Sequence, residues 1–193
     1  MIIIGLTGGM GSGKSFVAGK FEKKGVPVYN SDMRAKELME THPAIKKELI
    51  DKFGSMVFKN NLLNRKLIAG RIFNDKLLLT WINELVHPVV KNDFEQWVSE
   101  KKTKIVLKEA AILIESGAYK QCNKIIVITA PKPLRIKRVM LRDNMSYKEV
   151  EERMAKQISD TERLKYAYYT IINDGIKVVD KQVDAIFNEL TKQ

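Results

Sequence analysis

Blocks of apolar and polar residues along the first thirty positions predict a strand, a helix and a second strand. Residues 2–7 form a short apolar run typical of a buried strand, and a glycine-rich turn leads into a predicted helix over 14–24. Gly25 is expected to end that helix, because glycine tolerates the left-handed backbone found at helix C-termini. A second strand is predicted at 26–30. This unit is typical of a parallel sheet with right-handed crossovers.

The middle of the chain, residues 34–102, is predicted to be entirely helical. Within it His42 and Pro43 fit a helix start, since proline is favoured at the first helical position. Pro88 interrupts a long periodic stretch over 75–100, and we expect it to break or kink that helix.

The last ninety residues return to an alternation of strands and helices. Short β-branched runs at 105–107 and 125–129 predict two central parallel strands. Two helical segments follow, the second opening with a capping box from Ser146 to Glu149, and then a strand at 170–173 and a terminal helix. The order predicts an α/β fold: a doubly wound parallel sheet of about five strands with a helical insertion. Ligands bind such sheets beyond the carboxyl ends of the strands.

Composition narrows the class of protein. A chain of 193 residues suits one compact domain with a small insertion, and its charge of +11 favours anionic partners. The basic residues are scattered in pairs among acids, so we expect a solvated basic surface and no nucleic-acid partner. One cysteine excludes an internal disulfide, and no apolar run approaches the ~20 residues that span a bilayer. We therefore expect no membrane partner and a cytoplasmic location.

Residues Gly8 to Ser15, with the sequence GGMGSGKS, match the P-loop pattern in full and lie between an apolar strand and a helix, as that pattern requires. Glycine permits backbone angles at which consecutive N–H groups converge on phosphate oxygens, and the helix N-terminus adds a positive dipole end. We expect Lys14 to neutralise the β- and γ-phosphates of ATP and the Ser15 hydroxyl to bind Mg²⁺. A dinucleotide fingerprint fits less well, because Lys14 stands where that motif needs its third glycine.

Two carboxylates follow predicted strands and are candidates for catalysis. Asp32 could accept a proton from an attacking hydroxyl, or it could cap the helix that begins there. Glu109 ends the third strand, where P-loop enzymes often carry an acid that acts on Mg²⁺; a structural ion pair is the alternative. His87 fits a hydrogen-bonded structural histidine better than a catalyst. With two histidines and one cysteine in the chain, no zinc site is expected.

Arg135, Arg138 and Arg142 have spacings of three and four, which place them along one helix face. Guanidinium groups on a mobile segment could close over the phosphates and stabilise transition-state charge. A solvated basic face is the alternative. We single out Arg138 and Arg142 as the candidates for catalysis.

Taken together, the motifs resemble the dephospho-CoA kinase family over nearly the whole length. The resemblance is carried by separate segments in the family's order, namely Leu6–Ser15, Asn30-Ser31-Asp32 with Ala35-Lys36, Arg65, Phe73, Trp81-Ile82-Asn83, His87-Pro88, Ile112-Leu113-Ile114-Glu115, the three arginines and Ile171-Ile172-Asn173 with Gly175. Three positions depart from the family pattern: Asn30 replaces an aspartate, Ala111 a proline and Phe16 a threonine.

The resemblance implies a P-loop nucleoside triphosphate hydrolase-like fold and the ATP-dependent phosphorylation of the ribose 3′-hydroxyl of dephospho-CoA, with Mg²⁺, in a monomer or weak homo-oligomer. It implies a core at 1–35, 103–131 and 161–193, a CoA-side insertion at 36–102 and a lid at 132–160. The implied nucleotide-binding residues are Gly9, Gly11, Ser12, Gly13, Lys14, Ser15, Phe16 and Asn173. The implied substrate-binding residues are Asp32, Arg65, His87 and Glu115.

Other classes of protein remain open at this point. A nucleoside monophosphate kinase would share the P-loop, the lid and an acceptor domain. A GTP-binding switch fits less well, because Asp51-Lys52-Phe53-Gly54 lies within the predicted helical insertion and no guanine motif appears at Asn123-Lys124. The +11 charge would also suit a nucleic-acid-binding protein, although its scattered distribution argues against one.

Overall fold

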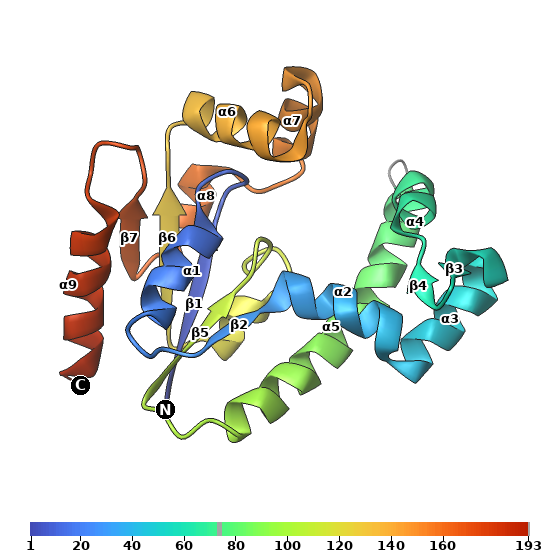
Figure 1. Ribbon diagram of the computed structural model, residues 1–193, viewed down its shortest axis with the longest axis horizontal. Coiled ribbons are helices and arrows are strands. Elements are labelled where there is room, and N and C mark those ends of the chain that lie inside the picture. Colours follow the sequence, from blue (N-terminus) through green and yellow to red (C-terminus); the bar gives the residue numbers. More distant parts are fainter. Residues whose placement is uncertain (73–74, 193) are drawn as a thin grey trace. The chain divides into compact units, whose positions relative to one another are not determined.

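The computed structural model (Figure 1) describes residues 1–72 and 75–192, so Phe73 of the family resemblance lies outside the described residues. Backbone contacts divide the chain into two units. We call them the sheet unit, Met1–Asn30 with Lys101–Gln193, and the helical unit, Ser31–Glu100. None of the described helices is long and apolar enough to cross a membrane.

The sheet unit contains five parallel strands in the order β2-β5-β1-β6-β7. Their bounds are β1 Ile2–Gly8, β2 Val28–Asn30, β5 Ile105–Glu109, β6 Lys124–Thr129 and β7 Tyr169–Ile172. The strand order reverses at β1, as in doubly wound folds, so the predicted fold class is confirmed. The observed strands differ from the predicted ones by at most two residues at either end.

Helices complete the sheet unit. They are α1 Lys14–Glu22, α6 Lys132–Asp143, α7 Tyr147–Met154, α8 Asp160–Leu164 and α9 Val179–Thr191, with the 3₁₀ helix η2 Ala118–Gln121. One face of the sheet packs with α1 and α9 through apolar residues such as Phe21 and Val183. The other face packs on the segment that follows β5, through Leu113 and Val127. The capping box at Ser146 and Glu149 is present as predicted.

The helical unit contains α2 Ser31–Thr41, α3 Pro43–Phe53, η1 Ser55–Val57, α4 Arg65–Ile72 and α5 Lys76–Ser99. The prediction that it is entirely helical was wrong. A two-stranded hairpin pairs β3 Phe58–Lys59 with β4 Leu62–Leu63. Its turn residues Asn60 and Asn61 have φ of 51° and 62°, a left-handed conformation that asparagine tolerates and that two-residue hairpins require.

Of the two outcomes expected at Pro88, a break or a kink, the break was wrong, because α5 has 24 residues and runs through Pro88 to Ser99. Its buried residues Ile82, Val86, Val90 and Phe94 lie on both sides of the proline. Packing of this continuous apolar face stabilises the helix against the loss of one backbone hydrogen bond. Pro43 is in the first turn of α3, as predicted.

Candidate active site

The P-loop follows β1 and leads into α1 at the carboxyl end of the central strand. Gly11 and Gly13 have φ of 77° and 95°, where residues with a Cβ are strained, and so glycine is needed at both positions. Ser12 is fully buried, and its backbone N–H donates to Gly9 O at 3.0 Å. Lys14 Nζ donates to Gly8 O at 3.0 Å, which brings its charge back over the loop. The result is a compact turn of main-chain amides with a cation beside it, suited to a polyphosphate.

A carboxylate lies at the neighbouring strand end. Ser15 Oγ donates to Glu109 Oε1 at 2.8 Å, and Asn30 Nδ2 donates to Glu109 Oε2 at 2.9 Å. Glu109 is 3% exposed. The three hydrogen-bonded residues come from three elements: Asn30 from β2, Glu109 from β5 and Ser15 from α1. The structure therefore brings together Ser15 and Glu109, the two residues that the sequence predicts to act on Mg²⁺.

Asn173 and Arg138 lie against the other side of the P-loop. Asn173 Nδ2 donates to Ser12 O at 2.8 Å, and a Cβ on Gly13 would come within 2.3 Å of that nitrogen. Arg138 Nη1 donates to Asn173 O at 3.1 Å and to Gly11 O at 3.4 Å. Of the predicted catalytic arginines, Arg138 is thus in direct contact with the loop.

Two further predicted residues lie on exposed surface in this arrangement. Arg142 forms two hydrogen bonds of 2.8 Å with the carboxylate of neighbouring Asp143, and this pairing raises the pKa of Arg142. Phe16 is 55% exposed on α1, where Lys20 Nζ lies 4.5 Å from its ring centroid.

Three further predicted residues lie in the helical unit. Asp32 is in the first turn of α2, which begins at Ser31. Arg65 Nη2 donates to Glu40 Oε1 at 3.0 Å. His87 is half-buried in α5, and burial lowers the pKa of its imidazole, which favours the neutral form at pH 7.

Glu115 belongs to the sheet unit and contacts the segment after α7. Its Oε1 accepts from the backbone N–H of Ile158 at 3.3 Å and lies 3.5 Å from Arg163 Nη2. Sequence reasoning missed Arg163, and it also missed Gln157, whose Oε1 accepts from the N–H of Met10 in the P-loop at 2.8 Å. These contacts join residues far apart in sequence, so no local pattern could have indicated them.

The donor set suits a magnesium ion held between protein and phosphate. Mg²⁺ prefers oxygen ligands and keeps several waters, so one hydroxyl and one nearby carboxylate are sufficient when phosphate oxygens complete its shell. Ser15 and Glu109 supply those two groups. Among the described residues no cluster of three or more histidine, cysteine or acidic side chains forms an all-protein metal site.

Comparisons with known proteins give a consistent result. A protein called dephospho-CoA kinase from Bacteroides fragilis (strain YCH46) is 43% identical over 94% of this chain and 89% of its own. One of the same name from Porphyromonas gingivalis (strain ATCC BAA-308 / W83) is 40% identical over 90% of this chain and 86% of its own. The crystal structure of TT1252 from Thermus thermophilus superposes with a TM-score of 0.84 at 29% identity, covering 99% of this chain and 97% of that one.

The family model described as dephospho-CoA kinase matches residues 2–178, which include every group of the site above. A match of this extent takes in both units of the fold. The chain belongs to the dephospho-CoA kinase family of P-loop kinases.

Proposed function

We propose that this protein transfers the γ-phosphoryl group of ATP to the ribose 3′-hydroxyl of dephospho-CoA, giving CoA and ADP. The observation that carries the proposal is the P-loop with Lys14 folded over it and the Ser15–Glu109 pair beside it, in a chain of this family. Such a site asks little covalent chemistry of the protein. It aligns the acceptor with the γ-phosphate and spreads negative charge over fixed donors.

On the nucleotide side, the loop from Gly11 to Ser15 holds the triphosphate, and Lys14 neutralises the charge that develops on the transferred group. Arg138 contacts the loop at Gly11 O, and we assign it to that group. Arg142 contributes only after its pair with Asp143 opens and the lid moves. Asn173 supports the loop through Ser12, and Phe16 borders the nucleotide from α1.

Magnesium would bind at Ser15, with Glu109 acting directly or through a water molecule. Bound there, the ion supplies charge neutralisation between the β- and γ-phosphates. Glu109 also orients the Ser15 hydroxyl by accepting its hydrogen bond, and Asn30 holds the second carboxylate oxygen by donating to it. Asn30 therefore performs a positioning role in this chain.

On the acceptor side, Asp32 accepts the proton of the 3′-hydroxyl as that oxygen attacks phosphorus. Arg65, His87 and Glu115 bind dephospho-CoA, and residues 36–102 form its domain. The lid is residues 132–160. We propose a cytoplasmic enzyme that is a monomer or weak homo-oligomer.

The test is ADP release coupled to a spectroscopic readout, with Mg-ATP and either dephospho-CoA or a panel of nucleoside monophosphates. We expect dephospho-CoA to give the highest kcat/KM by at least about tenfold. Lys14→Ala is the matched control and should lower kcat by about 10²-fold or more. Preference for a nucleoside monophosphate would assign the chain a different acceptor and contradict the proposal.

A further inference from the structure

Arg135 lies directly against the glycines of the P-loop. A Cβ on Gly9 would come within 2.0 Å of Arg135 Nη1, and one on Gly11 would come within 2.5 Å of the backbone oxygen of Arg135. Arg135 is only 8% exposed. The lack of a side chain at these two glycines therefore makes room for α6. It also allows the backbone to come close to a phosphate.

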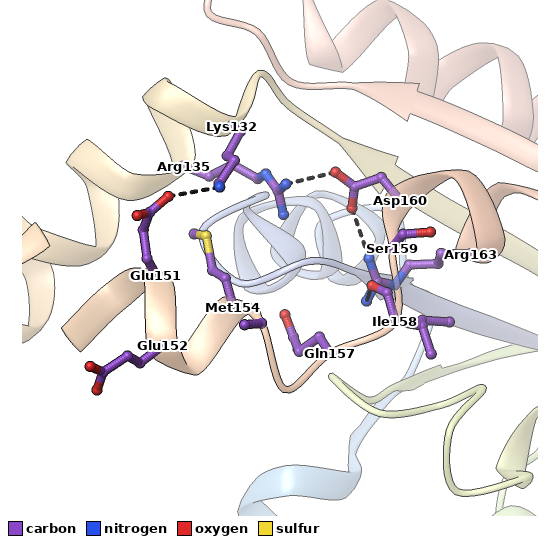
Figure 2. A pocket seen from close by; sticks show the side chains of 11 residues that line it. Lys132, Arg135, Glu151, Glu152, Met154, Gln157, Ile158, Ser159, Asp160 and Arg163 are labelled. Carbon is purple, nitrogen blue, oxygen red and sulfur yellow. Dashed lines mark hydrogen bonds and ion pairs between the residues drawn. The ribbon is translucent and has the colours of Figure 1, made fainter. Parts of the chain in front are cut away.

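Arg135 belongs to a network of four charged residues, of which Figure 2 shows Arg135, Asp160 and Arg163. Arg135 Nη2 donates to Asp160 Oδ2 at 2.6 Å, and Arg163 Nη1 donates to Asp160 Oδ1 at 2.8 Å, so one carboxylate bridges two guanidinium groups. Arg163 is 1% exposed and lies 3.5 Å from Glu115. We call Arg135, Asp160, Arg163 and Glu115 the anchor network. Its two positive and two negative charges balance, which is the condition for stable burial.

The anchor network borders a cavity of about 680 Å³ between α6, α7 and α8. A second ion pair, Lys132 with Glu151 at 2.8 Å, lines the same cavity, and its cation is far more exposed than Arg135. Figure 2 shows Lys132 and Glu151 pointing toward each other on one side of the cavity, and Arg135 pointing toward Asp160 on another. The two ion pairs thus join α6 to different neighbours.

Two further contacts bind the P-loop to α6, α7 and the residues that follow α7. The Met10 N–H donates to Gln157, and the Met10 side chain packs against Ile136, Val139 and Val150 of α6 and α7. Polar and apolar contacts therefore hold the lid segment on the outer side of the loop.

Arg135 and Arg138 are three residues apart on α6, so one turn of helix links the anchor network to the cation that touches Gly11 and Asn173. We propose that the anchor network is a positioning device: Asp160 and Arg163 fix Arg135 on the P-loop, and the helix thereby delivers Arg138 to the triphosphate. Asp160 and Arg163 are positioning residues, because they act through Arg138. The inference rests on the nucleotide half of the proposed function and not on the identity of the acceptor.

The test measures binding of a non-hydrolysable ATP analogue with Mg²⁺ by calorimetry, which needs no acceptor. Four proteins are compared: the unaltered chain, Asp160→Asn, Arg138→Met and the double variant. We expect Arg138→Met to raise the Kd by about tenfold, as for loss of a charged hydrogen bond. Asp160→Asn should raise the Kd several-fold, and the double variant should bind no more weakly than Arg138→Met alone.

The matched control is Glu151→Gln, which removes the other ion pair of the cavity and should leave the Kd within twofold of the unaltered chain. Asp160→Asn keeps the side-chain shape at a position 40% exposed, and Asp160→Glu serves as a second variant that should recover most of the affinity. Two results would overturn the proposal: an unchanged Kd in Asp160→Asn, or a Kd in the double variant raised by the product of the two single-variant factors. Turnover of dephospho-CoA by the unaltered chain is measured separately, so failure there contradicts the proposed function alone.

Discussion

At the scale of single residues, the site depends on side chains that have more than one partner. Glu109 accepts from Ser15 and from Asn30 and so ties α1 and β2 to the end of β5. The P-loop residues and Glu109 could be predicted from the sequence, because a local motif and a strand end indicate them. The sequence could not predict the roles of Asp160, Arg163 and Gln157. Their partners Arg135, Glu115 and Met10 are distant in sequence and come close only in the folded protein.

Glu109→Gln should raise the Mg²⁺ concentration that gives half-maximal activity and lower kcat by about tenfold or more, because the amide is neutral and a weaker ligand. Titration of magnesium at saturating ATP measures both quantities. Glu151→Gln is the matched control, since it makes the same carboxylate-to-amide change at an ion pair with Lys132, away from Ser15 and Glu109. An unchanged magnesium profile in Glu109→Gln would assign Glu109 a purely structural role.

Asp32→Asn should lower kcat by about 10²-fold or more, as for loss of a general base, while the affinity for the ATP analogue stays close to that of the unaltered chain. The kinetics are followed by ADP release and the affinity by calorimetry. The structure places Asp32 in the first turn of α2, and helix capping stays the alternative role that this variant tests. Normal turnover in this variant would mean that another group accepts the proton.

At the scale of elements, apolar patterning predicted the five strands of the sheet and most helices, because the central strands are buried on both faces and the helices bury one continuous face. Prediction from the sequence failed in the helical unit at two places. The strands β3 and β4 have two residues each, too few for an alternating pattern to appear. Pro88 has a strong local preference against helix, but the buried residues on both sides of it favour continuation.

Pro88→Ala should increase the free energy of unfolding by about 1–2 kcal/mol. Alanine restores a backbone donor and avoids the helix penalty of about 3 kcal/mol for proline, while the unfolded chain gains about 1 kcal/mol of conformational freedom. Urea denaturation followed by circular dichroism provides the value. A decrease in stability would show that the proline ring makes packing contacts that outweigh its cost to the helix.

At the scale of the whole molecule, the two units carry different parts of the prediction. The P-loop and its supporting residues lie in the sheet unit, together with α6 and α7, the helices of the proposed lid. The helical unit carries Asp32, Arg65 and His87, three of the four residues predicted for the acceptor, and the fourth, Glu115, lies in the sheet unit. The residues predicted for the nucleotide thus lie within one unit, and their ligand can be tested by itself.

Mg-ATP at about 100 times its Kd should increase the stability of the folded protein by about 2.7 kcal/mol, since it binds the native state and not the unfolded chain. Thermal unfolding with and without nucleotide measures the shift in Tm. Lys14→Ala should lose most of the shift while keeping the Tm of the ligand-free protein. The same shift in that variant would place nucleotide binding away from the P-loop.

The register of β1 has a consequence for how the protein is made. Ile2 pairs with Ile105, and Ile4 pairs with Lys124, so β1 leaves the ribosome before partners that lie more than a hundred residues later in the chain. Its row of isoleucines is exposed until then, and pairings over such distances form slowly. Nascent chains arrested before β6 emerges should therefore recruit chaperones and remain sensitive to protease, whereas longer arrested chains become resistant.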